Sequence, residues 1–257
     1  MFTKKLASLC NLLKLNAIKE YIGPVFKKYG IDINQAMLAL EELFGYQVQE
    51  NDIAKQLRSR KAAQLRFPNS MLENIDFGLK KGLNPAIVKR LAKGDWVKEC
   101  AHLIFIGPTG TMKTTLACAF ANALIVRGYK VRFYTLFDLL EALKIEDDKE
   151  DRNYLKRFLR KLKSIDVLVI DDWALFPLKT SQRRLLFEVI QQREDKGSLI
   201  ITSQYPPNKW HEAIGDGTTA DAVLDRIVHC SNTFNFSDEE SVRKLLGQKN
   251  GGVYVKH

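Results

Sequence analysis

A short apolar run that leads straight into a glycine-rich loop limits most strongly what this chain can fold into. Residues 102–107 read HLIFIG, the loop continues as GPTGTMKTT, and the next stretch, TTLACAFANALIVRG, is an apolar helix candidate that closes at Gly128. A buried strand, a glycine-rich turn and a helix in this order are the setting of a phosphate-binding loop, whose backbone N–H groups and helix N-terminus attract phosphates. The junction therefore predicts an α/β domain with a nucleotide site.

After the loop, further strand candidates alternate with helix candidates. KVRFYTL, IDVLVIDD and SLIITSQ are short and mostly apolar, and helical segments separate them, among them YLKRFLRKLKS and SQRRLLFEVIQQREDKG with Ser181 as the expected cap. Apolar strands that alternate with helices are typical of a parallel sheet covered on both faces. For residues 67–257 we therefore expect an α/β fold of the P-loop NTPase type, with a parallel sheet flanked by helices.

Residues 1–66 differ from the rest of the chain because their pattern of apolar residues predicts helices and no strands. Apolar residues recur near helical spacing in LCNLLKLNAIKEYIGPVFKKYG, where Gly23–Pro24 punctuates the pattern. Asn34 is the expected cap of a second helix that ends near Gly45, and a third helix is expected from about residue 51 to residue 65. We expect a small all-helical domain before the α/β domain.

The loop fits the pattern G-x-x-x-x-G-K-[ST] with one departure. Gly107, Lys113 and Thr114 match, and we expect Lys113 to reach the β and γ phosphates of ATP and the Thr114 hydroxyl to bind Mg²⁺. Met112 stands where a glycine would let the backbone approach the phosphates without a Cβ in the way. We expect the site to survive with reduced affinity. The residues expected to contact the nucleotide are Gly107, Pro108, Thr109, Gly110, Thr111, Met112, Lys113, Thr114 and Thr115.

Two adjacent carboxylates end the apolar stretch VLVIDDW. A buried strand delivers Asp171 at its tip, where a carboxylate can hold Mg²⁺ directly or through water. Asp172 follows it and is a candidate to polarise the attacking water. The alternative is that both acids cap a following helix. The glycine-rich loop upstream favours the catalytic interpretation.

The strand that ends in ITSQ also delivers polar residues to this edge, where the carboxyl ends of parallel strands meet. Ser203 or Gln204 is expected to orient the water or to contact the γ-phosphate, and the spacing leaves open which of the two does so. The alternative is that both residues simply begin the next turn.

Two arginines are further candidates for neutralising phosphate charge. Arg226 lies toward the end of ADAVLDRIVH and is a candidate to act on a neighbouring subunit, whereas Arg243 in DEESVRKLL is a candidate to reach the phosphates of its own subunit. A solvated helix face is an equal alternative for Arg226, and surface pairing with Glu239 is one for Arg243.

The chain is basic, with a net charge of +10, which fits either polyanion binding or a lysine-rich surface. The distribution favours the former, because five basic residues fall between positions 55 and 66 with no acid among them. Such residues suit contacts with the phosphates of duplex DNA that have little sequence preference and weaken steeply with salt. A solvated helix face is the alternative for any single one. The expected DNA-binding residues are Lys55, Arg58, Arg60, Lys61 and Arg66.

Cysteine usage and hydropathy bear on the compartment. The four cysteines are far apart and form no CxxC pair, which argues against a zinc site and fits the reducing cytoplasm, where we expect the protein. Since no run of about 18 apolar residues occurs, we expect no membrane span. The N-terminal stretch reads as an amphipathic helix rather than a signal peptide.

The chain resembles the insertion-sequence helper ATPase family IstB in the order of five segments. They are the glycine-rich loop, VLVIDDW, ITSQYPPNKWHEAIGD, ADAVLDRIVH and SVRKLL. That family belongs to the AAA+ ATPases, near the DnaC helicase loaders and the DnaA initiators, and the resemblance covers nearly the whole chain. It implies an ATPase that forms a homo-oligomer on duplex DNA, with ATP at the subunit interfaces. We expect hydrolysis to be slow, and we expect residues 1–66 to serve DNA binding and oligomerisation. It also implies a partner transposase, which the protein helps to choose and engage its target.

The resemblance extends to single residues of the site. Lys113 and Thr114 match the Walker A lysine and threonine, and Asp171 and Asp172 match Walker B. The end of ITSQ looks like sensor 1. Met112 departs from the family pattern, which has glycine.

The resemblance also implies roles outside the two Walker motifs. Arg226 matches the arginine finger and Arg243 the sensor 2 arginine. The connector from Phe67 to Phe77 is implied to lie near the adenine. Two alternatives stay open: a helicase loader, and a non-enzymatic DNA-binding assembly protein whose nucleotide site is degenerate at Met112.

Overall fold

The computed structural model describes residues 4–77, 83–147, 153–215 and 217–236. The chain divides into two compact units, residues 1–58 and residues 59–257, which we describe separately. Arg243 and the segment around it lie outside the described residues.

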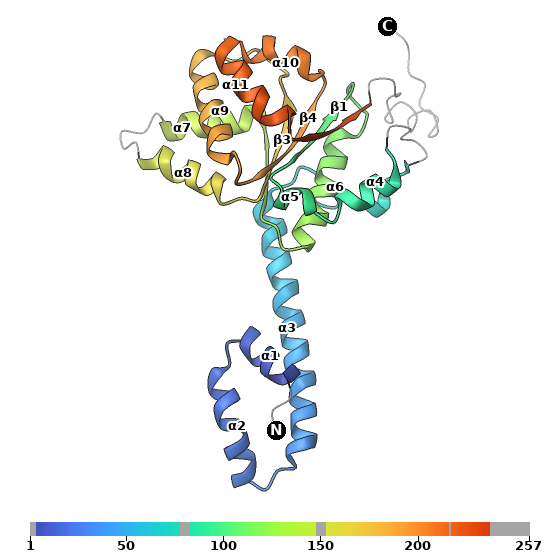
Figure 1. Ribbon diagram of the computed structural model, residues 1–257, viewed down its shortest axis with the longest axis vertical. Coiled ribbons are helices and arrows are strands. Elements are labelled where there is room, and N and C mark those ends of the chain that lie inside the picture. Colours follow the sequence, from blue (N-terminus) through green and yellow to red (C-terminus); the bar gives the residue numbers. More distant parts are fainter. Residues whose placement is uncertain (1–3, 78–82, 148–152, 216, 237–257) are drawn as a thin grey trace. The chain divides into compact units, whose positions relative to one another are not determined.

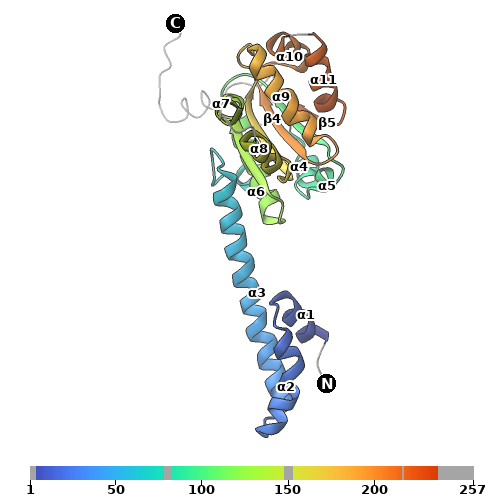
Figure 2. The same ribbon diagram turned by 90° about the vertical axis from the view of Figure 1, so that its left-hand side faces the viewer.

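The first unit is helical, as expected, and contains α1 (Lys4–Leu12), α2 (Asn16–Lys28) and most of α3 (Ile33–Ala63) (Figures 1 and 2). Its small core consists of the buried side chains Leu6, Cys10, Ile22 and Met37.

The helix boundaries in this unit differ from the prediction. Asp32 Oδ1 accepts hydrogen bonds from the N–H groups of Asn34 (2.9 Å) and Gln35 (3.5 Å), so Asp32 and not Asn34 provides the capping oxygen of α3. The predicted break near Gly45 is wrong, because α3 is continuous through it. A glycine inside a helix costs only about 1 kcal/mol relative to alanine, which neighbouring helical residues can offset. Pro24 likewise lies inside α2 without ending it.

The second unit is built on a five-stranded sheet with the order β2-β3-β4-β1-β5. All four neighbouring pairs are parallel, which confirms the predicted parallel sheet. The strands are β1 (His102–Ile106), β2 (Val131–Thr135), β3 (Val167–Trp173), β4 (Ser198–Ser203) and β5 (Ser231–Asn235). The edge strand β5 was not expected from the sequence, because SNTFN is largely polar and only Phe234 within it is buried.

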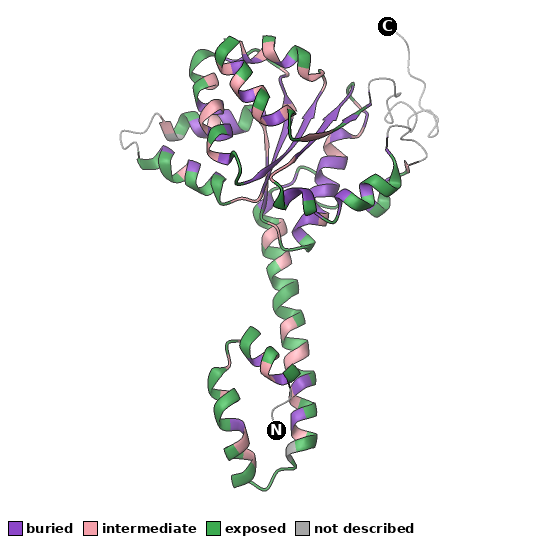
Figure 3. Ribbon diagram, in the orientation of Figure 1, coloured by how far each residue is buried: buried purple, intermediate pink, exposed green. Residues whose placement is uncertain are grey.

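Helices cover both faces of this sheet (Figures 1 and 3). Strand side chains alternate between the faces: Leu103 and Phe105 of β1 join one core cluster, and Ile104 and Ile106 join the other. The first cluster is covered by η1 (Leu72–Asn74), α4 (Pro85–Leu91), α5 (Asp95–Lys98) and α6 (Lys113–Val126). The second is covered by α7 (Leu136–Asp147), α8 (Asn153–Lys163), α9 (Thr180–Arg193), α10 (Pro207–Ile214) and α11 (Gly217–Val228).

Side chains near the ends of the strands start two of these helices. The Thr135 hydroxyl accepts the N–H of Asp138 at 3.0 Å in the first turn of α7. The side-chain oxygen of Gln182 accepts the N–H of Lys179 at 2.9 Å at the start of α9. The predicted capping role of Ser181 is wrong, because this residue lies inside α9. Among the described residues, no helix is both long and apolar enough to cross a membrane.

Candidate nucleotide site

The glycine-rich loop connects β1 to α6 at the carboxyl edge of the sheet. The Gly107 N–H donates to the Ser203 carbonyl at 3.1 Å, and the Phe236 N–H donates to the Ile106 carbonyl at 2.7 Å, so both neighbouring strands brace the start of the loop. Gly107 has a φ of 156°, and a Cβ there would lie 2.9 Å from Cβ of Phe236. Only glycine fits this close approach between the loop and the end of β5.

Met112 takes the backbone conformation that glycine would adopt. It has φ 61° and ψ 17°, in the left-handed region, directly before the first residue of α6. A side chain in this region costs roughly 1–2 kcal/mol. The Met112 side chain is partly buried and packs against the first core cluster. Met112 therefore holds a left-handed backbone at the start of α6, at the cost of local strain.

Lys113 and Thr114 occupy the first turn of α6. The Lys113 ammonium is buried and donates to the Pro108 carbonyl at 2.9 Å, across the mouth of the loop. The Thr111 hydroxyl donates to the same carbonyl at 2.9 Å. The Thr114 hydroxyl contacts Asp171, at 2.9 Å from Oδ1 and 3.1 Å from Oδ2. The structure thus brings the loop and the tip of β3 together.

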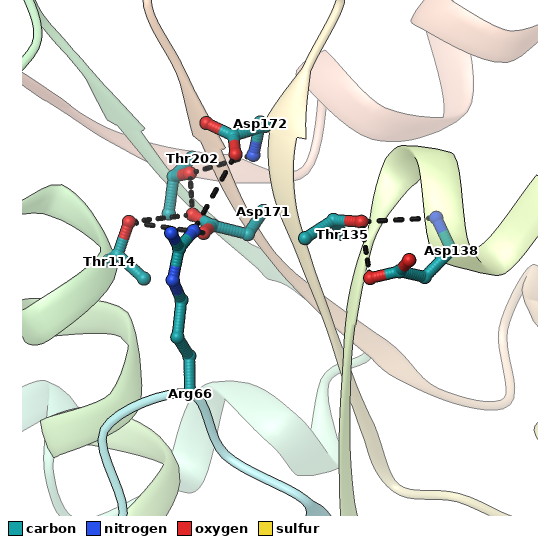
Figure 4. A network of polar contacts seen from close by, with 7 residues as sticks. All are labelled: Arg66, Thr114, Thr135, Asp138, Asp171, Asp172 and Thr202. Carbon is teal, nitrogen blue, oxygen red and sulfur yellow. Dashed lines mark hydrogen bonds and ion pairs between the residues drawn. The ribbon is translucent and has the colours of Figure 1, made fainter.

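Asp171 is fully buried and is held by groups from three segments (Figure 4). Besides Thr114, the hydroxyl of Thr202 on β4 makes a short hydrogen bond to its Oδ1. Arg66 Nη1 lies 3.4 Å from Oδ2. A buried carboxylate needs such partners, because burial of an unpaired charge is very unfavourable.

Asp172 is exposed to the cavity because β3 changes register at its end. A bulge lies between Ile170 and Trp173, and Asp172 itself has a φ of 56°. Its N–H lies 3.3 Å from the Thr202 hydroxyl, and its carboxylate lies 3.8 Å from Arg66 Nη1. Burial raises the pKa of Asp172, the charge of Asp171 adds to this, and Arg66 and Lys113 act in the opposite direction.

These groups surround a cavity of about 630 Å³, within the size range of small-molecule sites. It is lined by Arg66, Phe67, Thr109, Gly110, Met112, Lys113, Thr114, Thr115, Asp172, Leu175 and Gln204.

The two polar residues at the end of β4 have different surroundings. Ser203 is buried away from the cavity, where its hydroxyl donates to the Trp173 carbonyl at 2.9 Å and accepts the indole N–H of Trp210 at 3.0 Å. Gln204 lines the cavity. Thr202, the residue before Ser203 on β4, contacts Asp171 and was not predicted from the sequence, because the contact depends on the pairing of β3 with β4.

The aromatic candidates and Arg226 have different positions relative to this cavity. Phe67 lines the cavity, but Phe77 packs against the first core cluster. Arg226 does not line this cavity: its Nε donates to Glu194 at 2.8 Å, and its Nη1 donates to the Ala222 carbonyl at 2.7 Å. It borders a separate cavity of about 350 Å³ that also includes Cys230.

The predicted DNA-binding residues also have different environments. Lys55, Arg58 and Lys61 are exposed on α3, and Arg60 is partly buried. Arg66 lies beyond the end of α3 and borders the nucleotide cavity.

The chemistry of the site suits Mg²⁺. The groups that converge at the tip of β3 offer oxygen atoms, a hydroxyl from Thr114 and a carboxylate from Asp171. Mg²⁺ prefers oxygen ligands and is usually held by one or two carboxylates together with substrate phosphates. The residues present therefore fit a magnesium–nucleotide complex.

Comparison with known proteins identifies the fold and the family. A protein of Sinorhizobium fredii named as insertion sequence ATP-binding protein y4pL is 36% identical over 192 residues, covering 73% of this chain and 77% of the relative. AMPPCP-bound DnaA from Aquifex aeolicus superposes with a TM-score of 0.56 at 22% identity, covering 76% of this chain and 58% of that chain. The DnaC helicase loader gives 0.54 at 21% identity, covering 66% and 98%.

The two structural likenesses confirm the predicted AAA+ P-loop fold. The family described as IstB-like ATP binding protein matches residues 18–249, nearly the whole chain. Together with the identity to the Sinorhizobium protein, this match shows that the chain belongs to the IstB-like ATP-binding proteins.

Proposed function

We propose that this chain is an ATP-dependent DNA-binding assembly protein that oligomerises on duplex DNA and assists a partner transposase in choosing and engaging its target. The observation that supports this most is the contact between Thr114 and Asp171, which joins the loop to the tip of β3 beside the Lys113 ammonium. Membership of an ATP-binding family supports the nucleotide, and the name of the Sinorhizobium relative supports the insertion-sequence setting.

ATP binding would use the loop and the first turn of α6. The Lys113 ammonium lies 2.9 Å from the Pro108 carbonyl, and it would exchange this neutral partner for the β and γ phosphates. The Thr114 hydroxyl and the Asp171 carboxylate would hold Mg²⁺, which supplies charge neutralisation on the phosphates when bound. Phe67, at the border of the cavity, is suited to contact the adenine.

Hydrolysis would use Asp172 and Gln204, which both border the cavity. A raised pKa makes the Asp172 carboxylate a better proton acceptor for the attacking water. The Gln204 amide can orient the same water, because it offers both a donor and an acceptor.

Arg226 would act on the nucleotide of a neighbouring subunit. It does not border its own cavity, and its guanidinium is held by Glu194, the residue that follows the end of α9. An arginine supplied from another subunit is a common way to stabilise the charge of phosphoryl transfer. This role requires a homo-oligomer with ATP between subunits. Arg243, which lies outside the described residues, is proposed to serve the phosphates of its own subunit.

Duplex DNA would be bound through the exposed basic residues of α3. Lys55, Arg58 and Lys61 follow one another at intervals of three positions, so they project from neighbouring parts of the helix surface. Contacts of lysine and arginine with phosphates position DNA without reading its sequence. We place the protein in the cytoplasm, which agrees with the free state of all four cysteines.

The proposal is tested by imaging the protein on duplex DNA with and without ATP, in parallel with Lys113→Ala. We expect regular assemblies for the parent chain with ATP, and none for the variant. If the variant assembles on DNA and depends on ATP as the parent chain does, the loop does not bind the nucleotide. If a pull-down retains replicative helicase and not transposase, the result contradicts the proposed role in transposition and supports that of a helicase loader.

A further inference from the structure

Arg66 occupies a position that its place in the basic stripe does not explain. The basic stripe is the set of five residues predicted to bind DNA: Lys55, Arg58, Arg60, Lys61 and Arg66. Its guanidinium lies 3.4 Å from Asp171 and 3.8 Å from Asp172, and its side chain borders the nucleotide cavity. The other members of the stripe, Lys55, Arg58, Arg60 and Lys61, do not border this cavity. Arg66 is therefore a component of the nucleotide site.

The backbone on both sides of Arg66 is fixed to the ATPase unit. Before it, Arg132 Nη1 donates to the Ala62 carbonyl at 2.8 Å, and Leu65 is buried. After it, the Asn122 amide donates to the carbonyls of Pro68 and Ser70, at 2.9 and 2.8 Å. The side chain itself is 52% exposed. The side chain is therefore free to change partners while its point of attachment stays in place.

The position of the guanidinium conflicts with a bound Mg²⁺. Mg²⁺ binds carboxylate oxygen at about 2.0–2.1 Å, and Arg66 Nη1 lies 3.4 Å from Oδ2 of Asp171, the acid that would hold the ion. Two cations that share the Asp171 carboxylate repel each other, and water screens this repulsion only in part, because Arg66 is half-exposed and the acid is fully buried. Arrival of the ion should therefore displace the guanidinium. Phosphate oxygens in the same cavity are its best new partners, because the planar guanidinium binds phosphate with two parallel hydrogen bonds.

We propose that Arg66 exchanges partners with nucleotide occupancy: it neutralises the Asp171–Asp172 pair when no Mg²⁺–nucleotide is bound, and it turns onto the phosphates when Mg²⁺ takes its place. This inference rests on the proposed function, because it requires that the cavity binds ATP. It assigns Arg66 to the nucleotide and removes it from the DNA-binding set.

The exchange predicts a specific dependence on Mg²⁺. In Arg66→Gln the competing cation is gone, so less Mg²⁺ is needed for half-maximal binding of a fluorescent ATP analogue. With Mg²⁺ the variant lacks the Arg66 contact with the phosphates, so affinity falls by about tenfold, the scale of one lost charge-assisted contact. Without Mg²⁺, in EDTA, affinity falls further, because the two carboxylates of the acid pair are left without their arginine and repel the anionic nucleotide. The ratio of the affinities with and without Mg²⁺ therefore rises. A purely structural role would change both affinities alike.

Three variants make the test decisive. Arg66→Lys keeps the positive charge and is expected to stay near the parent in its Mg²⁺ requirement. Arg58→Gln is the matched loss of one arginine from the stripe, and it is expected to weaken DNA binding and leave the ratio unchanged. Lys113→Ala is expected to abolish nucleotide binding.

The outcomes separate this inference from the function on which it rests. An unchanged ratio in Arg66→Gln, together with loss of binding in Lys113→Ala, would overturn the role of Arg66 and leave the nucleotide site intact. Retained binding in Lys113→Ala would overturn the site itself. If Arg66→Gln weakens DNA binding as much as Arg58→Gln does and leaves the ratio unchanged, Arg66 belongs to the DNA-binding set and the inference is wrong.

Discussion

The hydroxyl of Thr114 lies within hydrogen-bond distance of both carboxylate oxygens of Asp171, at 2.9 and 3.1 Å. These residues are separated along the chain by a helix, a strand and two further helices, and the sheet order places β3 beside β4, which in turn lies beside β1. Their contact depends on the parallel arrangement, which brings the loop after β1 and the tip of β3 to the same edge.

Thr114→Ala should weaken binding of the Mg²⁺–nucleotide. A hydrogen bond to a charged group contributes roughly 1.5–3 kcal/mol, so the affinity for a fluorescent ATP analogue in Mg²⁺ should fall by about tenfold or more. Thr114→Ser keeps the hydroxyl and is the matched control, with affinity close to that of the parent. Equal affinities for the alanine and serine variants would show that the hydroxyl does not hold the ion.

Met112→Gly should bind nucleotide more tightly than the parent chain. Met112 has a left-handed backbone, with φ 61°, at the point where the loop meets α6. Glycine adopts this conformation without strain and removes the Cβ from the path of the phosphates. Met112→Ala keeps the Cβ and the strain and loses only the thioether. We expect a several-fold gain for glycine and little gain for alanine, measured by titration calorimetry. If alanine gains as much as glycine, the bulk of the side chain and not the backbone limits affinity.

Arg226→Ala should stop hydrolysis and leave ATP binding by the single subunit intact, because Arg226 does not border its own cavity. Loss of an arginine finger reduces turnover by about a thousandfold or more. Mixing Arg226→Ala with Lys113→Ala should restore part of the phosphate release, since interfaces form that join an intact loop to an intact arginine. Inactive mixtures, from variants that still associate, would argue against action between subunits.

Substitution of the exposed basic residues of α3 should reduce the salt dependence of DNA binding. Each phosphate contact contributes about 0.9 to the slope of log affinity against log salt concentration. Lys55→Gln, Arg58→Gln and Lys61→Gln together should therefore lower the slope by about 2–3. The control removes the same charge from α8 by three substitutions: Lys156→Gln, Arg160→Gln and Lys163→Gln. A larger effect of the α8 set, in fluorescence anisotropy with duplex DNA, would move the DNA-binding surface to that helix.

His102 should make the fold less stable in acid. Its Nδ1 accepts the N–H of Leu199, and Nε2 contacts the Arg226 carbonyl, both at 3.2 Å, so the ring is neutral. Burial lowers the pKa of His102 below its ordinary 6.5. Below pH 6.5 the unfolded chain therefore binds a proton that the folded chain does not, and the free energy of unfolding falls as the pH drops.

Urea unfolding of the parent chain and of His102→Asn at pH 7.5 and at pH 5.5 measures this contribution. Asparagine keeps an acceptor near the position of Nδ1 and does not titrate, so the variant should lose less stability between the two pH values. Equal losses in both proteins would assign the acid sensitivity to other groups.

Much of the ATPase unit was predictable from local sequence. The strands β1 and β4 are short, mostly apolar runs that the sheet buries on both faces, so their hydrophobicity is the signal itself. β5 lacks that signal because it is an edge strand with only one buried side chain. In the first unit, Gly45 indicated a helix end, but a single glycine is too weak to end a helix without a proline or a capping residue nearby.

The site was predictable where it depends on adjacent residues and was missed where it depends on contacts across the fold. Lys113, Thr114 and Asp171 follow from two local motifs. The bond from Thr202 to Asp171 depends on the pairing of β3 with β4, which no local pattern specifies. Arg66 belongs to a basic run along the chain, and only the fold shows that it contacts the buried acid.

The cavity beside Arg226 contains a natural attachment point for a probe. Cys230 is exposed, Cys100 at the border of the same cavity is partly buried, and Cys10 and Cys118 are buried. Burial raises the pKa of Cys118 to about 11. A maleimide dye would therefore react first at Cys230, which borders the same hollow as Arg226 and lies apart from the phosphate-binding loop. Its fluorescence would report the arrival of a neighbouring subunit in real time, without any engineered cysteine.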